Sequence, residues 1–252
     1  MECMKKRNLD IHVPRGTKLA VVGDIHEHEE QFDKLIDIIQ PSEKVFLISV
    51  GDVYDKGFGT LQAQSITDKL RTMSEAGHGF AVRGNHELKK IKRARESNSM
   101  TDQLAWFEHQ PLALSFVFFN GSRVTVVHGG VKPAHTWDDL DHDIETSYIR
   151  KLDENGEMIK LKWVESNGVR TLRPSKEGGK SWHDSYDGRF GYIVAGHEPL
   201  KDGKPKFYSY SSNIDTACYC TGILTCQVIG ENGLEFLHSV EGIASRWREN
   251  FS

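Results

Sequence analysis

The stretch that decides the fold is KLAVVGDIHEHEEQFDKLIDIIQP, residues 18–41. An apolar strand at 18–22 runs directly into the polar loop at 23–26. Apolar residues then recur every three or four positions as far as Ile39, before Pro41 stops the pattern. The order strand, loop, helix predicts the first half of a βαβ unit, with polar side chains at the end of its strand.

The same unit recurs further along the chain. A buried strand at 45–50, reading VFLISV, is followed by a glycine-bearing loop. The face of the next helix is marked by Ile66, Leu70 and Met73, and a third strand is expected at 80–82. Strands that alternate with helices predict right-handed crossovers and functional loops at the carboxyl ends of the strands.

The second half of the chain favours antiparallel pairing. Apolar runs at 116–119 and 123–127 flank Asn120-Gly121, a dipeptide favoured in tight hairpin turns. Together the two halves suggest a β-sandwich with flanking helices. Further strands are expected at 192–195, at 223–229, and at 234–237 after a turn through Glu231-Asn232-Gly233.

Length and composition indicate one globular domain, 1–252. Hydrophobic residues make up 38% of the 252 residues and charged residues 27%, and no apolar stretch approaches the roughly 20 residues that cross a bilayer. The basic start, MECMKKRNLD, is followed by no long apolar core. We therefore expect a cytoplasmic protein without membrane contact.

Net charge and cysteine spacing bear on two further classes, nucleic-acid-binding proteins and proteins with a cysteine-ligated zinc site. A net charge of -4 gives no global attraction to nucleic acid, so nucleic-acid partners are possible but not favoured. The cysteines lack the paired spacing of a zinc site, and buried, reduced thiols are expected. They are Cys3, Cys218, Cys220 and Cys226.

A polar, turn-rich segment interrupts the second half at about 138–187. It contains Glu154-Asn155-Gly156, Ser166-Asn167-Gly168 and a short apolar run at 159–164. We interpret the segment as an insert that lies over the functional site.

Side chains that ligate metals follow five of the predicted strands. Carboxylate, imidazole and amide groups, one small set at each strand end, suit a pair of divalent cations, and the absence of cysteine argues against structural zinc. Taken singly, an aspartate after a strand is more often a helix cap or turn residue. The candidate ligands are Asp24, His26, Asp52, Asn85, His128 and His197.

The motifs that carry these residues read GDIHEH, GDVYDKG, RGNHE, HGG and AGHEP in chain order. They resemble the metallophosphoesterases, specifically the phosphoprotein-phosphatase branch, whose signature runs GDxHG, GDxxDRG, GNHE, HGG and GH. The resemblance covers about residues 21–227 and is nearest to small bacterial and phage members, which also share the stretch SNIDTACYCTGILT. It implies a four-layer α/β/β/α sandwich of two mixed β-sheets, the calcineurin-like phosphoesterase fold.

The resemblance also implies a role for each candidate residue. Asp24 and His26 bind a first metal, Asp52 bridges, and the second metal is held by Asn85, His128 and His197. A shared carboxylate can hold two cations about 3.5 to 4 Å apart. His86 would be the general acid, oriented by Asp55. The implied metal is manganese, with iron, zinc or nickel as alternatives.

Two positions depart from the family pattern. The last glycine of the first motif is Glu27, which must fit a tight loop, as a partner of His26 or the metal or as a solvated side chain. The arginine of the second motif is Lys56, a point charge in place of a forked donor. Arg83 is the second candidate for phosphate binding, while Arg170 and Arg173 of the insert are more simply solvated.

The run at 88–95 is rich in lysine and arginine directly after His86. A cationic helix there would attract polyanionic substrates, although a solvated helix face is the simpler interpretation. Trp163 and Trp182 of the insert could stack on bases, but tryptophans in such a segment more often pin it to the core.

The function expected from the resemblance is two-metal hydrolysis of phosphomonoesters, most of all phosphoserine or phosphothreonine in proteins, with broad activity on small substrates. Dinucleoside polyphosphate hydrolysis and the processing of RNA ends or 2',3'-cyclic nucleotides are the alternatives. A metal-binding scaffold without catalysis is the alternative from another class. The complete ligand set and the His86 and Asp55 pair argue against that scaffold.

Overall fold

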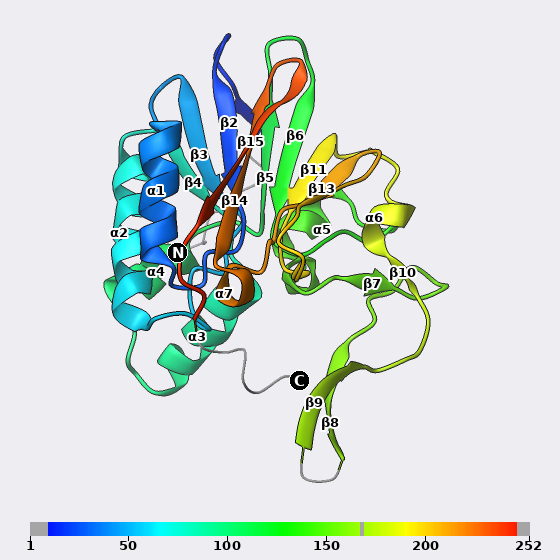
Figure 1. The fold of residues 1–252 in the computed structure, drawn as a ribbon. Helices are drawn as coiled ribbons and strands as arrows, with labels where there is room; N and C mark the ends of the chain where they lie inside the picture. The colour runs from blue at the N-terminus through cyan, green and yellow to red at the C-terminus, as the bar shows by residue number, and fades with distance from the viewer. Residues whose placement is uncertain (1–9, 167–168, 246–252) are drawn as a thin grey trace, which may run out of the picture.

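The computed structural model describes residues 10–166 and 169–245, and two mixed β-sheets packed face to face form its centre (Figure 1). One sheet has five strands, in the order β15 (Gly233–Glu241), β14 (Ile223–Gly230), β2 (Lys18–Val22), β3 (Val45–Ser49) and β4 (Gly79–Ala81). The other has six, in the order β1 (Asp10–His12), β5 (Ala113–Val117), β6 (Arg123–Val127), β11 (Tyr192–Ala195), β13 (Ser211–Asn213) and β12 (Lys206–Phe207).

Strand pairing follows the two halves of the sequence. β2, β3 and β4 pair in parallel, as the βαβ pattern predicts, and β14 joins β2 in antiparallel fashion. In the six-stranded sheet β6, β11 and β13 are parallel, whereas β5 and β6 form the predicted antiparallel hairpin. Parallel strands end at the same edge of a sheet, which brings their following loops together.

Helices cover the outer face of the five-stranded sheet (Figure 1). Alternation along β2 explains the layering: Ala20 and Val22 pack toward the helices, while Leu19 and Val21 pack between the sheets. The predicted end of the first helix at Pro41 is confirmed, because Gln40 adopts a left-handed conformation. The helices are α1 (Glu29–Ile39), α2 (Thr60–Glu75), α3 (Asn85–Glu96) and α4 (Asp102–Glu108).

The outer face of the six-stranded sheet is covered by shorter elements. They are α5 (Trp137–His142), the 3-10 turn η1 (Ile144–Ser147) and α6 (Trp182–Ser185). Trp182 is 1% exposed and pins this layer to the sheet, as expected, whereas Trp163 is 55% exposed. The predicted order of helices, sheet, sheet and helices is confirmed.

The insert divides into two parts. Its short strands β7 (Lys151–Leu152) and β10 (Lys180–Ser181) pair beside the body, while the hairpin of β8 (Leu161–Ser166) and β9 (Val169–Pro174) projects away from it (Figure 1). β8 begins later than the expected 159–164 because Ile159 is buried and donates its N–H to the Lys151 carbonyl. The predicted turn at Asn167-Gly168 lies outside the described residues.

The structure also bears on the predicted hairpins, short strands and cysteines. Both expected hairpins are present, and their glycines, Gly121 and Gly233, have positive φ. The three-residue strands β1 and β13 were not predicted, because neither has an apolar alternation long enough to recognise. Cys218 and Cys226 are buried thiols as expected, Cys220 is only half-buried, and Cys3 lies outside the described residues. Among the described residues, no helix combines the length and apolarity needed to span a membrane.

Candidate metal centre

The predicted metal ligands meet at one end of the sandwich. Asp24 and His26 follow β2, Asp52 follows β3, and Asn85 opens α3 directly after β4. His128 and His197 come from the ends of β6 and β11 in the other sheet. Asn85 is half-buried and the remaining candidates are at most 6% exposed.

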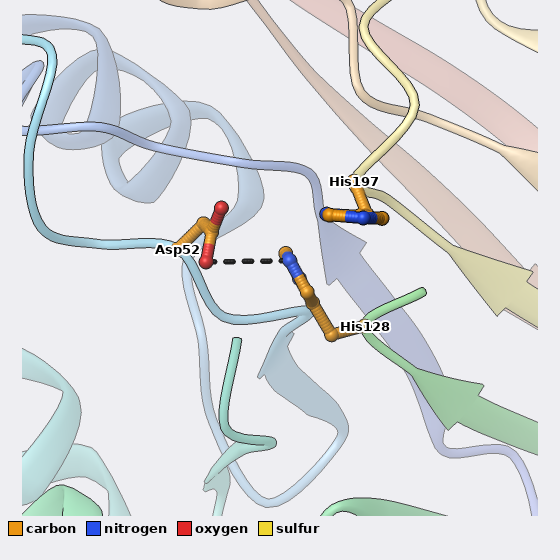
Figure 2. Close-up of side chains that lie close together, drawn as sticks. All are labelled: Asp52, His128 and His197. Carbon is orange, nitrogen blue, oxygen red and sulfur yellow. Dashed lines mark ion pairs between the residues drawn. The ribbon is translucent and has the colours of Figure 1, made fainter. Parts of the chain in front are cut away.

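These side chains form two groups that share one carboxylate. Ligand atoms of Asp24, His26 and Asp52 lie within 4.8 Å of one another, and so do those of Asp52, His128 and His197. Figure 2 shows the second group, in which Asp52 Oδ1 lies 3.3 Å from His128 Nε2. Asn85 Oδ1 joins it at 3.1 Å from the same nitrogen. Two groups of potential ligands therefore share Asp52, and its role as a bridge between two metals stays a prediction.

Backbone carbonyls orient all three imidazoles. His26 Nδ1 lies 3.1 Å from the Tyr54 oxygen, and His128 Nδ1 lies 2.8 Å from the Val50 oxygen. His197 uses its Nε2 instead, 3.1 Å from the oxygen of Tyr148 in the insert. A ring nitrogen that donates to a carbonyl leaves the other nitrogen with a lone pair, which is how metal-binding histidines are usually held. The donor set therefore fits a pair of divalent cations.

Burial and neighbouring charges shift the pKa values of the candidate ligands in different directions. Burial raises the pKa of Asp24 well above its usual value, and repulsion from Asp215 adds to this. Burial would raise the pKa of Asp52 as well, but attraction to His128 and His86 outweighs it and holds that pKa well below normal. For His26 and His197 burial lowers the pKa, so both rings are neutral, the form that binds metal.

His128 differs, and a pH dependence follows. Burial alone would lower its pKa, but Asp52 and Asp24 outweigh burial and raise the pKa to about 9. The metal-free ring is therefore protonated below that pH, and a cation must displace the proton. We expect manganese affinity to rise with pH up to about 9 and binding at pH 7.5 to release the proton held by His128.

Titration calorimetry in two buffers with different heats of protonation measures this release. His128→Asn is the matched control and should abolish most of it. Binding without proton release in the unaltered protein would contradict the protonation state assigned to His128.

The expected acid and its partner are in direct contact. His86 Nδ1 lies 2.7 Å from Asp55 Oδ2, which leaves His86 Nε2 pointing to the metal groups, 3.8 Å from Asp52 Oδ2. Burial would raise the pKa of Asp55, but hydrogen bonds from His86 and Lys90 outweigh burial and hold it well below its usual range. Asp55 is thus a permanent anion that orients the ring.

The predicted phosphate ligands are not equally placed. Lys56 Nζ lies 3.1 Å from His26 Nε2 and 4.6 Å from the centre of the Tyr219 ring, so the ammonium borders the first metal group. The charges that act on Arg83 are those of Asp141, Glu108 and Arg95, which belong to neither group. Phosphate binding by Arg83 stays a prediction, as does that by Lys56.

Glu27 is buried, which contradicts the solvated alternative. Its carboxylate accepts hydrogen bonds from the N–H groups of Asp55, Gly57 and Gly59, at 3.0, 3.2 and 3.0 Å. These bonds offset the cost of its left-handed backbone, with φ of 62°. Glu27 thus shapes the loop that carries Asp55.

Glu87, the last residue of RGNHE, was missed as a site residue although its motif was recognised. Fully buried, it accepts from the N–H groups of Asp52 and Gly84, both at 2.8 Å, and from that of Val53 at 2.8 Å. A side chain on Gly84 would collide with the Asp52 carboxylate. The position of Asp52 is therefore fixed by its N–H bond to Glu87 and by the close approach of Gly84 to its carboxylate.

Sequence reasoning also missed three groups at the rim of the centre. The charge of Arg150 acts on His197, Asp215 and Tyr219, and its buried Nε lacks a hydrogen-bond partner among the described residues. Asp215 and Tyr219 lie in the stretch SNIDTACYC, which was recognised only as a family likeness. Arg173 of the projecting hairpin is exposed and donates to Thr171 within that hairpin.

Comparison with known proteins agrees with this geometry. Residues 17–212 match the family model of the calcineurin-like phosphoesterases. Serine/threonine-protein phosphatase 5 of Arabidopsis thaliana is 29% identical in an alignment of 222 positions, which covers 77% of this chain and 38% of that protein. The chain spans less than two fifths of the length of the curated protein phosphatases it matches.

A second group of relatives is closer in length. The asymmetrical bis(5'-nucleosyl)-tetraphosphatase PrpE of Anoxybacillus flavithermus is 22% identical over 224 residues, 87% of this chain and 78% of that protein. A solved structure provisionally described as a diadenosine tetraphosphatase superposes with a TM-score of 0.65 at 23% identity, covering 92% of this chain and 97% of that one. A yeast phosphatase with similarity to human PP5 superposes with a TM-score of 0.58 at 17% identity, covering 94% and 84%.

Proposed function

Because the chain belongs to the calcineurin-like phosphoesterase family and is a metal-dependent phosphoesterase, we propose that it hydrolyses phosphomonoesters, above all phosphoserine and phosphothreonine. Asp24, His26 and Asp52 would hold one divalent metal, preferably manganese, and Asp52 with Asn85, His128 and His197 the other. When bound, two such ions activate water, orient the phosphate and neutralise charge that develops in the transition state.

The protein's own groups supply the remaining functions. His86 holds a proton on Nε2 for the departing oxygen, and Asp55 fixes the ring through Nδ1. The positive charges of Lys56 and Arg150 both act on the buried Asp215, and we assign both residues to the phosphate. Glu27 and Glu87 accept hydrogen bonds from the loop 52–59 and so hold Asp55 and the shared ligand Asp52 in place.

One observation carries the choice of substrate, the 2.7 Å contact between His86 and Asp55. An alkoxide from serine is a strongly basic leaving group, so its departure depends on protonation. A nucleoside polyphosphate leaves as a weakly basic anion and needs little help from an acid. An intact, oriented acid therefore favours alkyl phosphomonoesters.

The second candidate is dinucleoside polyphosphate hydrolysis. It is favoured by relatives of similar length that bear this activity in their names and match 87% of the chain, against 77% for the plant protein phosphatase. The positive rim of Lys56 and Arg150 would suit a polyphosphate chain as well as a single phosphate.

A substrate panel with saturating manganese decides between the two. The panel comprises a phosphoserine peptide, p-nitrophenyl phosphate, diadenosine tetraphosphate and a 2',3'-cyclic nucleotide, with Asp52→Asn as the inactive control. We expect the highest kcat/KM among the natural esters for the phosphopeptide. A clear preference for diadenosine tetraphosphate would overturn the proposal in favour of the second candidate.

Arg150 gives a separate prediction about phosphate binding. Arg150→Met should raise KM for p-nitrophenyl phosphate about tenfold or more, because hydrogen bonds to charged groups contribute about 1.5 to 3 kcal/mol. Arg173→Met, at the exposed insert arginine, is the matched control and should leave KM unchanged. If Arg150→Met leaves KM unchanged and Lys56→Met raises it, Lys56 binds the phosphate without Arg150.

A further inference from the structure

Lys90 contacts the carboxylate that orients His86, the proposed acid. Lys90 Nζ lies 2.9 Å from Asp55 Oδ1, while His86 Nδ1 takes the other oxygen, Oδ2, at 2.7 Å. His86 and Lys90 are four residues apart on α3 and so share one face of that helix. Each carboxylate oxygen of Asp55 therefore contacts one side chain of the same helix.

Lys90 is distinguished from the rest of the basic run at 88–95. Lys92 and Arg95 form ion pairs at the surface, at 3.9 Å from Glu96 and 2.5 Å from Glu108, and their side chains are 78% and 66% exposed. The side chain of Lys90 is 26% exposed, and its ammonium also lies 5.6 Å from the centre of the buried Tyr54 ring. Its position is thus held by packing as well as by charge.

Asp55 needs such a restraint. Its backbone has φ of 68° and is fixed through the N–H bond to Glu27, but that bond does not hold the side-chain carboxylate. With 27% of its side chain exposed, water could solvate Oδ1 and turn Oδ2 away from the ring. A cation on Oδ1 fixes the rotation and leaves Oδ2 aimed at His86.

We propose that Lys90 is a positioning residue for hydrolysis, which holds Asp55 so that Asp55 holds His86 in line with the leaving oxygen. The inference rests on the proposed acid role of His86 and not on the identity of the natural substrate. It assigns Lys90 to the support of the His86 and Asp55 pair. The alternatives are that Lys90 attracts polyanionic substrates or belongs to a solvated helix face.

The test compares two small esters that differ in leaving group. Phenyl phosphate releases a phenol with a pKa of about 10 and needs an acid, whereas p-nitrophenyl phosphate releases a far weaker base. In Lys90→Met we expect kcat for phenyl phosphate to fall about three- to tenfold, a fraction of the usual contribution of a general acid. KM and the p-nitrophenyl rate should change less than about twofold, and Lys90→Arg should restore kcat.

Lys89→Met is the matched control, because Lys89 is the exposed neighbour on the same helix and carries the same charge. It should change neither rate. The decisive variant is the double replacement of His86 by asparagine and Lys90 by methionine. If Lys90 acts through His86, the second change should add no further loss on phenyl phosphate.

The outcomes separate the two claims. Should His86→Asn lose rate equally on both esters, the acid role itself fails, and with it the basis for Lys90. If His86→Asn lowers kcat more for phenyl phosphate than for p-nitrophenyl phosphate but Lys90→Met does not, the Lys90 inference alone is overturned. An additive loss in the double variant would also overturn the Lys90 inference. The test does not depend on the natural substrate, because it uses phenyl phosphate and p-nitrophenyl phosphate rather than a phosphopeptide.

Discussion

Asp52→Asn is expected to abolish phosphatase activity and to weaken the binding of both ions. Its carboxylate belongs to both metal groups, and the amide that replaces it lacks the charge that two cations share. Activity should fall to the level of the uncatalysed control for every ester. Calorimetric titration with manganese should show the loss of high-affinity binding at both sites.

Asp215→Asn is the matched control, since it also removes one buried carboxylate beside the centre but belongs to neither group. It should keep a stoichiometry of two. Two sites that still fill at unaltered affinity in Asp52→Asn would show that Asp52 is not the shared ligand.

His86→Asn should produce a loss that depends on the leaving group. The ring is absent from both metal groups, so the variant should keep both ions. Its rate on a phosphoserine peptide should fall at least about tenfold further than its rate on p-nitrophenyl phosphate, because general acids contribute about 10² to 10⁴ and a basic alkoxide needs them most.

Steady-state kcat for both substrates at saturating manganese measures the gap, provided that chemistry limits turnover. His109→Asn, which alters an exposed histidine at the end of α4, is the control and should leave both rates unchanged. Equal losses on the two substrates would remove His86 from the role of the acid. A loss of metal would make it a ligand.

The metal centre could be predicted because its residues follow apolar strands directly. Asp24 and Asp52 come two and three positions after β2 and β3, and the carboxyl ends of parallel strands lie at one edge of the sheet. Strand order and residue chemistry predicted the cluster, and the family resemblance supplied the role of each ligand. The same reasoning predicted two sheets with helices outside them.

Long-range polar contacts could not be predicted in this way. The role of Glu27 depends on three N–H groups of the loop 55–59, and no local pattern announces which side chain will accept from them. Arg150 and Lys90 are charged residues in polar stretches, where a solvated side chain is the ordinary expectation. Arg150 acts on Asp215 through its charge and Lys90 forms an ion pair with Asp55, and only the fold brings these residues near one another.

The central claim is that two ions share Asp52, and an anomalous difference map from a manganese-grown crystal tests it most directly. Two peaks are expected, one among Asp24, His26 and Asp52 and the other among Asp52, Asn85, His128 and His197. A single peak at full occupancy, or two peaks of which only one contacts Asp52, would contradict the account.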